Sequence, residues 1–168
     1  MYDVNKNRQK WRIRHNALSK YSYLSKDKIL EVFAGWGNMT KYWSQIAGQV
    51  ISNEKDLSKL GFVLPENVKT LNLDYRDNHI IELCKNIEII DCDAFGLIMD
   101  YVKELCEMSN TNKLIFFTDG IKKRSKVLKK INIEKYFNNY NYDDIYYEQC
   151  TMGNVFYGYI FKRKIYEL

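Results

Sequence analysis

Cysteine and histidine are scarce in this chain of 168 residues, which leaves little material for a metal site. The four cysteines lie far apart without a CxxC pair, and there are only two histidines, so no metal site is expected. No apolar run approaches the roughly 18 residues that cross a bilayer, and the N-terminus lacks the apolar stretch of a signal peptide. The sequence therefore predicts a cytoplasmic protein with reduced thiols and no membrane partner.

Acidic residues are few in two regions where basic residues gather. Residues 1–28 hold eight Lys/Arg against two Asp, and residues 122–135 hold seven against one Glu. Clustered cations release counterions from a phosphate backbone, so this distribution favours a nucleic acid as the partner. The alternative is a solvated surface of lysines. The length and the 46% apolar content predict one domain with its own core.

The N-terminal region differs in amino-acid composition from the rest of the chain. Residues 1–27 are rich in Asn, Lys, Arg and Tyr, and their apolar residues are loosely placed for one face of an irregular helix. We predict a basic arm over residues 1–27, appended to a domain over residues 28–168. Trp11 in this arm is interpreted as a hydrophobic contact that docks the arm on the sheet. The alternative is a stacking surface for a base.

From residue 28 onward, short apolar runs alternate with helical segments, which is typical of parallel strands joined by helical crossovers. The expected strands cover residues 28–35, 49–53, 68–74, 87–93 and 113–119. The expected helices cover residues 39–48, 56–60, 79–85, 97–108 and 122–140. Two further strand-like runs, 143–150 and 155–164, are close enough in sequence to predict an antiparallel hairpin. The fold class is therefore α/β, with a mostly parallel seven-stranded sheet, a C-terminal antiparallel hairpin and helices on both faces.

A glycine turn follows the first expected strand, in the segment Ile29–Asn38 (ILEVFAGWGN). Gly35 and Gly37 allow a tight turn and a close approach to a ligand, and the next helix begins with free N–H groups. Glu54 ends the second strand about 20 residues later, where a nucleoside ribose would lie, and Asp74 follows the third strand, near an adenine amine. These residues indicate a nucleoside-containing ligand at the carboxyl edge of the sheet. The alternative for the turn alone is an ordinary strand-to-helix connection.

The fourth expected strand ends in two carboxylates, Asp91 and Asp93, followed by Phe95. A carboxylate at this place can accept a hydrogen bond from an exocyclic amine and take up a proton as that nitrogen forms a new bond. Phe95 can stack on a base or pack in the core. Asp91 and Asp93 share one face of the strand, so the sequence leaves open which of them faces the pocket. Cys92 lacks the Pro-Cys context of cytosine chemistry and is not interpreted as a nucleophile.

The segments FAGWGN, SNEKD, LNLD, IIDCDAFG and LIFFTDG, in this order, resemble the catalytic domain of the tRNA guanine-N2-dimethyltransferase family over roughly residues 28–120. More generally, the chain is similar to class I S-adenosylmethionine-dependent methyltransferases, which have a Rossmann-like fold. The resemblance implies S-adenosylmethionine as the cofactor, Asp93 as the catalytic aspartate and Asp119 as an acid at the edge of the active site. Ala94 stands where the dimethyltransferase family has proline. Either the substrate differs, or the basic segments replace that family's C-terminal RNA-binding domain.

The sequence therefore predicts a methyltransferase that acts on an amino nitrogen of a nucleic-acid base, in RNA (tRNA above all) rather than in DNA. The expected catalytic residues are Asp91, Asp93 and Phe95. The expected cofactor-binding residues are Glu31, Phe33, Gly35, Gly37, Asn38, Glu54 and Asp74. The expected nucleic-acid contacts are Lys10, Arg12, Arg14, Lys122, Lys123 and Arg124. The alternatives are a DNA base methyltransferase, a small-molecule methyltransferase and an inactive nucleic-acid-binding module with this fold, and the oligomeric state stays open.

Overall fold

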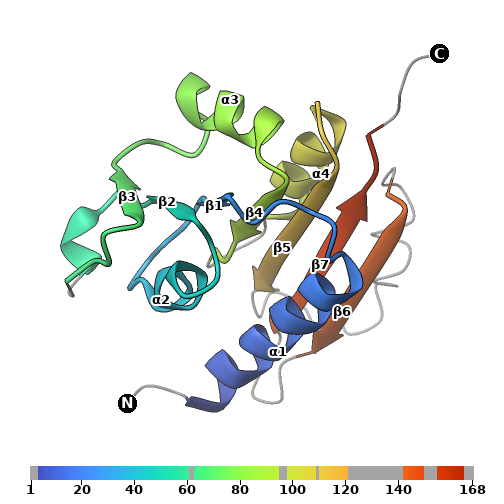
Figure 1. Ribbon diagram of the computed structural model, residues 1–168, viewed down its shortest axis with the longest axis horizontal. Coiled ribbons are helices and arrows are strands. Elements are labelled where there is room, and N and C mark those ends of the chain that lie inside the picture. The colour runs from blue at the N-terminus through green and yellow to red at the C-terminus, as the bar shows by residue number, and fades with distance from the viewer. Residues whose placement is uncertain are drawn as a thin grey trace.

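Seven strands form one sheet in the order β3-β2-β1-β4-β5-β7-β6 (Figure 1). The computed structural model describes residues 4–60, 63–94, 98–108, 110–120, 142–149 and 155–164. The strands are β1 (Lys28–Glu31), β2 (Gln49–Asn53), β3 (Val68–Leu71), β4 (Ile89–Cys92), β5 (Lys113–Gly120), β6 (Asp144–Gln149) and β7 (Val155–Lys162). The described helices are α1 (Val4–Lys20), α2 (Asn38–Ser44), the short 3₁₀ helix η1 (Leu57–Lys59), α3 (Asn78–Asn86) and α4 (Met99–Glu107).

One strand, β7, runs against the direction of the others. β1 pairs in parallel with β2 and β4, β2 with β3, and β4 with β5, whereas β7 pairs antiparallel with both β5 and β6. All four residues of β4 are buried, because helices cover both faces of the parallel part. The predicted α/β fold, with its mostly parallel seven-stranded sheet and C-terminal antiparallel hairpin, is confirmed.

The helices enclose a separate apolar core on each side of the sheet. Ile29 and Ile89 point to the side covered by α1 and α2, and Leu30 and Ile90 point to the side covered by α3 and α4. Successive side chains of a strand point to opposite faces, so each strand supplies both cores. We call these two sides the α1/α2 face and the α3/α4 face (Figure 1).

Helix α1 is a regular helix of 17 residues, packed on the sheet beside β7 and β6 (Figure 1). Ile13 and Ala17 are almost fully buried in the core of the α1/α2 face. Just after the helix, Tyr21 donates a hydrogen bond to Asp144, at the start of β6, as does Lys20. The expectation of an irregular appendage is therefore corrected, because the apolar residues recur at helical spacing and bury one side of α1.

The observed elements lie close to the expected ones, with four differences in extent. The first strand ends at Glu31 rather than at residue 35, and α2 ends at Ser44 rather than at residue 48. The third strand stops at Leu71 rather than at residue 74, because the side chain of Asn72 turns to the backbone carbonyls of Glu54 and Lys55. The helix expected over residues 56–60 is the single short turn η1.

Some predicted features lie outside the described residues, namely Phe95, Lys122, Lys123, Arg124, the helix over residues 122–140 and the side chain of Asp119. In the part of the chain that the structure describes, no helix is long and apolar enough to cross a membrane. No group of His, Cys, Asp and Glu within that part is arranged to hold a metal ion.

Gly158 allows β7 to approach its neighbouring strands closely. A Cβ at this position would lie 2.2 Å from the carbonyl oxygen of Tyr146 and 2.7 Å from the ring of Phe117. Gly158→Ala is therefore expected to lower the free energy of unfolding by about 3 kcal/mol, measured by urea denaturation, because the backbone oxygen cannot move without opening the hairpin. The control is Gly48→Ala, whose new Cβ meets its nearest atom at 3.0 Å, and which should cost less than half as much. Equal losses would contradict this account.

Candidate active site

The carboxyl ends of β1, β2 and β4 bring acidic side chains to one edge of the sheet. Glu31 of β1 is in register with Ser52 of β2 on one side and with Asp91 of β4 on the other. Glu54 follows β2, and Asp93 follows β4. Four of the acids singled out in the sequence therefore gather at the edge where open α/β sheets bind their ligands.

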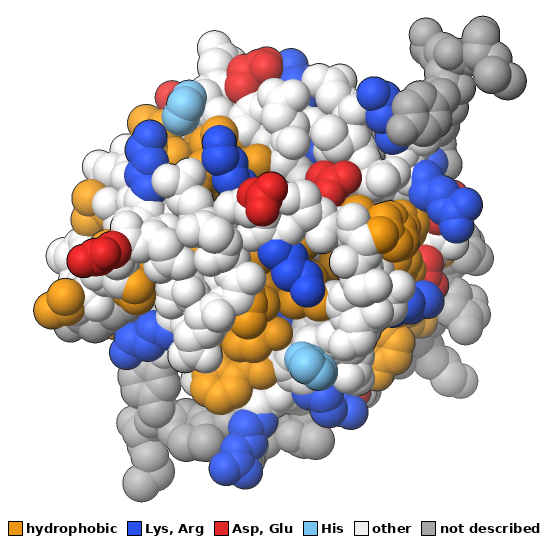
Figure 2. Space-filling view, viewed as in Figure 1, with side chains coloured by type: hydrophobic (Ala, Val, Ile, Leu, Met, Phe, Trp, Pro, Cys, Tyr) orange, Lys and Arg blue, Asp and Glu red, His pale blue; other side chains and the backbone are white. Residues whose placement is uncertain are grey.

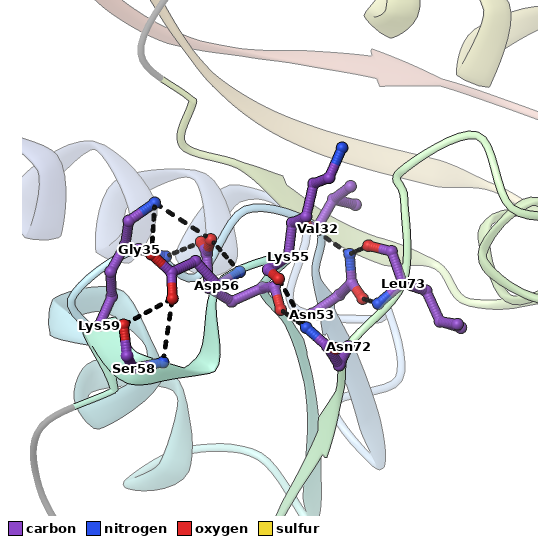
Figure 3. A network of polar contacts seen from close by, with 10 residues as sticks. Val32, Gly35, Asn53, Lys55, Asp56, Ser58, Lys59, Asn72 and Leu73 are labelled. Atoms are coloured by element: carbon purple, nitrogen blue, oxygen red, sulfur yellow. Dashed lines mark hydrogen bonds and ion pairs between the residues drawn. The ribbon is translucent and has the colours of Figure 1, made fainter.

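The glycine turn after β1 is joined to the end of β2 through Glu54. Gly35 and Gly37 have φ angles of 53° and 74°, in the left-handed region that favours glycine. The Gly35 N–H donates a hydrogen bond to Glu54 Oε2 at 2.8 Å, while Glu54 Oε1 accepts one from the Asp56 N–H at 3.0 Å and lies 3.4 Å from Lys59 Nζ. Figure 3 shows the turn facing this network. Apart from the neighbours of Gly35 in the chain, no atom of the described residues lies within 4 Å of the position of a Cβ on Gly35, so the space beside the turn is open.

Asn53 connects the loops that follow β1 and β3, a role that the sequence reasoning missed. Its buried side-chain amide donates hydrogen bonds to the carbonyls of Val32 and Leu73, both at 3.1 Å, and its oxygen accepts one from the Leu73 N–H (Figure 3). The signal was present, because an asparagine at a strand end next to Glu54 has both donors and acceptors for two loops. Asn53 therefore fixes the spacing of the loops on either side of Glu54.

The loop after β3 carries Asp74 and Tyr75. Asp74 has a half-exposed side chain that accepts a hydrogen bond from the Arg76 N–H at 3.0 Å. The ring of Tyr75 lies 5.3 Å from that of Phe33, measured between centroids. Phe33 thus forms an aromatic contact between the loops that follow β1 and β3. Asn38 begins α2 directly after the glycine turn.

Glu31 is a fully buried carboxyl group with one oxygen satisfied. Its Oε2 accepts hydrogen bonds from the hydroxyls of Thr40 at 2.5 Å and Ser52 at 3.1 Å. Its Oε1 has no hydrogen-bond partner among the described residues. Burial, followed by the neighbouring charge of Asp91, raises the pKa of Glu31 to about 8. A hydrogen-bond donor on a ligand would satisfy the remaining oxygen.

Glu31 is expected to make the fold less stable as the pH rises from about 4.5 to about 8. The folded chain holds a proton on Glu31 that the unfolded chain has lost in this range, so the stabilisation present at low pH disappears as the pH passes the folded pKa. Glu31→Gln should remove about 5 kcal/mol of this pH dependence, measured by urea unfolding at several pH values. Glu66→Gln, at an exposed position, is the control and should leave the profile unchanged. An unchanged profile in Glu31→Gln would contradict this prediction.

Asp91 is held by residues of the two helices on the α1/α2 face. Arg14 of α1 donates from Nε and Nη2 to its two carboxylate oxygens, each at 2.7 Å, and Trp43 of α2 donates from Nε1 at 2.6 Å. Arg14 and Asp91 are both almost completely buried. Neither the Asp91 carboxylate nor the Arg14 guanidinium is therefore at the surface, which argues against the catalytic role predicted for Asp91 and the nucleic-acid contact predicted for Arg14.

Asp93 is paired with Lys10. The Lys10 ammonium lies 2.6 Å from both oxygens of Asp93, and it also lies 5.1 Å from the centre of the Tyr157 ring. Burial alone would raise the pKa of Asp93, but Lys10 and then Arg14 outweigh it and hold the pKa below its ordinary value. Both side chains keep 13–14% of their surface exposed, whereas the side chain of Asp91 has none. Asp93 is the one of the two strand-end aspartates that remains accessible.

The two ion pairs match the geometry of a helix lying over a strand. Lys10 and Arg14 are four residues apart in α1, about 6 Å along its axis, and Asp93 and Asp91 are two residues apart, about 6.6 Å in an extended chain. Arg12 points elsewhere and pairs with Glu148 of β6 at 2.5 Å, with its side chain 57% exposed. The cations of α1 that were expected to contact a nucleic acid are therefore engaged within the chain.

The arrangement of the sheet and its helices is that of Rossmann-like class I methyltransferases. Solved structures with this fold include an S-adenosylmethionine-dependent O-methyltransferase from Thermotoga maritima, with a TM-score of 0.61 and 13% identity over 100% of this chain and 68% of that one. An rRNA methylase from Streptococcus thermophilus has a TM-score of 0.53 and 13% identity, over 84% of this chain and 90% of that one. TYW2 from M. jannaschii, solved in complex with AdoMet, has a TM-score of 0.54 and 16% identity, over 89% of this chain and 75% of that one.

Sequence comparison finds no match: no protein-family model fits the chain, and no curated protein resembles it in sequence. At these identities the structural likeness establishes the fold, and the residues of the site must carry the argument for function.

Proposed function

We propose that this chain is an S-adenosylmethionine-dependent methyltransferase acting on an amino nitrogen of a nucleic-acid base. The observation that carries the proposal is the 2.8 Å contact between the Gly35 N–H and the Glu54 carboxylate beside an open space. A glycine turn and a strand-end carboxylate together form a cradle for a nucleoside with a charged substituent.

The side chains at this edge fit the chemistry of S-adenosylmethionine. Glu54 would accept hydrogen bonds from the ribose hydroxyls, and Asp74 would accept one from the adenine amine. The unsatisfied Oε1 of Glu31 would face the ammonium group of the methionine end. Phe33 and Tyr75 supply an apolar wall beside these polar groups. When bound, the cofactor supplies an electrophilic methyl group.

Asp93 is proposed to hold the acceptor amine. The nitrogen of Lys10 already donates to this carboxylate, so the position accommodates an N–H donor. A substrate amine would take that place once the Lys10 side chain turns away, and it would then donate its N–H to the Asp93 carboxylate. Asp93 would orient the nitrogen lone pair and receive the N–H proton as the new N–C bond forms.

RNA, with tRNA first, is the proposed acceptor. The excess of Lys and Arg in residues 1–28 and 122–135 supports a polyanion. The rRNA methylase among the structural neighbours supports RNA over DNA. The test is tritium transfer from labelled S-adenosylmethionine to bulk tRNA, rRNA and DNA. Label in tRNA or rRNA is the expected result, and no label in any of the three, despite measured cofactor binding, would overturn the proposal.

Glu54→Ala is expected to weaken binding of S-adenosylhomocysteine by at least about 30-fold, because the ribose hydroxyls lose their acceptor in a partly buried site. Isothermal titration calorimetry measures this directly and needs no acceptor. The control is Glu66→Ala, which removes an exposed carboxylate between β2 and β3 and should leave the affinity unchanged. Equal affinities for the two variants would move the cofactor site elsewhere.

A second candidate is a nucleic-acid-binding module that has this fold and no activity. The observation in its favour is that Lys10 already fills the hydrogen-bonding positions of Asp93. Binding of RNA without methyl transfer to any acceptor, by a chain that binds S-adenosylhomocysteine, would favour this candidate.

A further inference from the structure

The two helices on the α1/α2 face contain no acidic residue. Their basic residues are Lys6, Arg8, Lys10, Arg12, Arg14, Lys20 and Lys41. The helices on the opposite face, α3 and α4, together contain four acidic residues and two lysines. The charge of the helical layers therefore differs in sign between the two faces of the sheet.

Internal ion pairs leave part of this basic charge at the surface. Lys10, Arg12, Arg14 and Lys20 pair with acids of the sheet. Arg8 and Lys41 have exposed side chains on the outside of α1 and α2, and those of Arg12 and Lys20 are more than half exposed within their ion pairs. The outer surface of this face is thus positive, although most cations of α1 are committed to the fold.

An aromatic pair with one exposed ring and one partly buried ring lies where α1 meets α2. The rings of Trp11 and Tyr42 are nearly parallel, with 12° between their planes and 6.3 Å between their centroids, and Trp11 is 39% exposed. Figure 2 shows hydrophobic side chains gathered between these helices, with Lys and Arg side chains at the border of the patch. Trp11 lies against Tyr42 of α2, whereas the sequence predicted a contact with the sheet.

Each ring of the aromatic pair is one residue away in sequence from a side chain that holds a strand-end aspartate. Trp11 directly follows Lys10, which contacts Asp93, and Tyr42 directly precedes Trp43, which contacts Asp91. A flat aromatic surface flanked by cations is what an unpaired base and its phosphates require. Bases in a duplex offer no free face for such stacking.

We propose that the surface formed by α1 and α2, with Trp11 and Tyr42 as a stacking platform, binds a single-stranded segment of RNA next to the acceptor base. This inference rests on the proposed function for its choice of RNA. A second copy of the chain is a poor occupant, because a two-fold contact through this face would place its cations against one another. A polyanion neutralises them.

Binding is measured by fluorescence anisotropy with a labelled single-stranded RNA of mixed sequence, 12 nucleotides long, and with the matching duplex. Trp11→Ala should weaken binding of the single strand about tenfold, since stacking on one aromatic ring is lost. Arg8→Ala should weaken it about threefold and reduce the slope of log affinity against log salt by roughly 0.7. The control, Lys103→Ala, removes an exposed cation of α4 on the opposite face and should change neither quantity.

A second readout places the bound strand without relying on loss of affinity. Trp43 is buried and Trp36 is exposed, so in a Trp36→Phe variant the accessible indole is that of Trp11. Single-stranded RNA should quench this fluorescence at the concentrations that saturate binding. Unchanged affinity in Trp11→Ala and Arg8→Ala, or no quenching in Trp36→Phe, would overturn the inference.

These outcomes can be told apart from failure of the proposed function. RNA binding that depends on Trp11, without methyl transfer, would overturn the activity and leave the binding surface standing. Methyl transfer to RNA that is insensitive to Trp11→Ala and Arg8→Ala would leave the activity standing and overturn the binding surface. Sedimentation velocity adds a third outcome, because a dimer that Trp11→Ala converts to a monomer would assign the patch to self-association and overturn the inference.

Discussion

Arg14→Met is expected to lower the free energy of unfolding by about 3–5 kcal/mol, because it leaves the buried carboxylate of Asp91 without its cation. Arg14 is 1% exposed and makes two hydrogen bonds of 2.7 Å to this carboxylate, so water cannot replace it. Methionine keeps much of the length and apolar bulk of the side chain, which separates the loss of charge from the loss of packing. Urea unfolding at neutral pH measures the change.

Arg12→Met is the matched control for this prediction, because it removes the same group two residues earlier in α1. The Arg12 side chain is 57% exposed in its pair with Glu148, and exposed ion pairs contribute little. It should change the stability by less than about 1 kcal/mol. Adding Asp91→Leu to Arg14→Met should recover part of the loss, since an apolar pair replaces an uncompensated charge. Equal effects of Arg12→Met and Arg14→Met would contradict the structural role of Arg14.

Asp93→Asn is expected to lower the turnover number for methyl transfer by about 10²–10³, because the amide cannot take up the acceptor's proton and binds the amine less strongly. The affinity for S-adenosylhomocysteine should stay within about twofold, since Asp93 lies at the end of β4 and the cofactor groups are assigned to Glu31, Glu54 and Asp74. Single-turnover rates with saturating cofactor measure the chemical step.

The control for this variant is Asp100→Asn, at an exposed position in the first turn of α4, which should keep full activity. Calorimetric binding of S-adenosylhomocysteine to Asp93→Asn checks that the variant is folded. Full turnover in a folded, cofactor-binding Asp93→Asn would remove Asp93 from the chemistry and leave the acceptor position unassigned.

Most of the fold could be predicted because its signals are local. Apolar runs of strand length, the glycine turn and the short connection before β7 are each contained in a few neighbouring residues. The approach of Glu54 to Gly35 also followed from local rules, because parallel strands bring their carboxyl ends to one edge. The finer resemblance to the tRNA guanine-N2-dimethyltransferase family stays a prediction, since the structural neighbours include both an rRNA methylase and an O-methyltransferase.

The partners of the basic residues in α1 could not be predicted, because they lie far away in the sequence. Lys10 and Arg14 pair with acids 83 and 77 residues later, and charge counting assigned both cations to the surface. One signal could have corrected this: Ile13 and Ala17 lie on the same side of the helix as Arg14, so the apolar side that buries them also buries the guanidinium. A basic segment with a buried side requires acids in the core, and Asp91 in an apolar strand was the candidate.

The contacts of α1 also bear on the order in which the chain acquires its structure during synthesis. This helix is synthesised before its partners, because Asp91 follows Arg14 by 77 residues, Asp93 follows Lys10 by 83, and Glu148 follows Arg12 by 136. Until those residues have emerged from the ribosome, the cations and the apolar side of α1 have nothing to dock on. The nascent helix must therefore wait with this side exposed until most of the sheet has been synthesised.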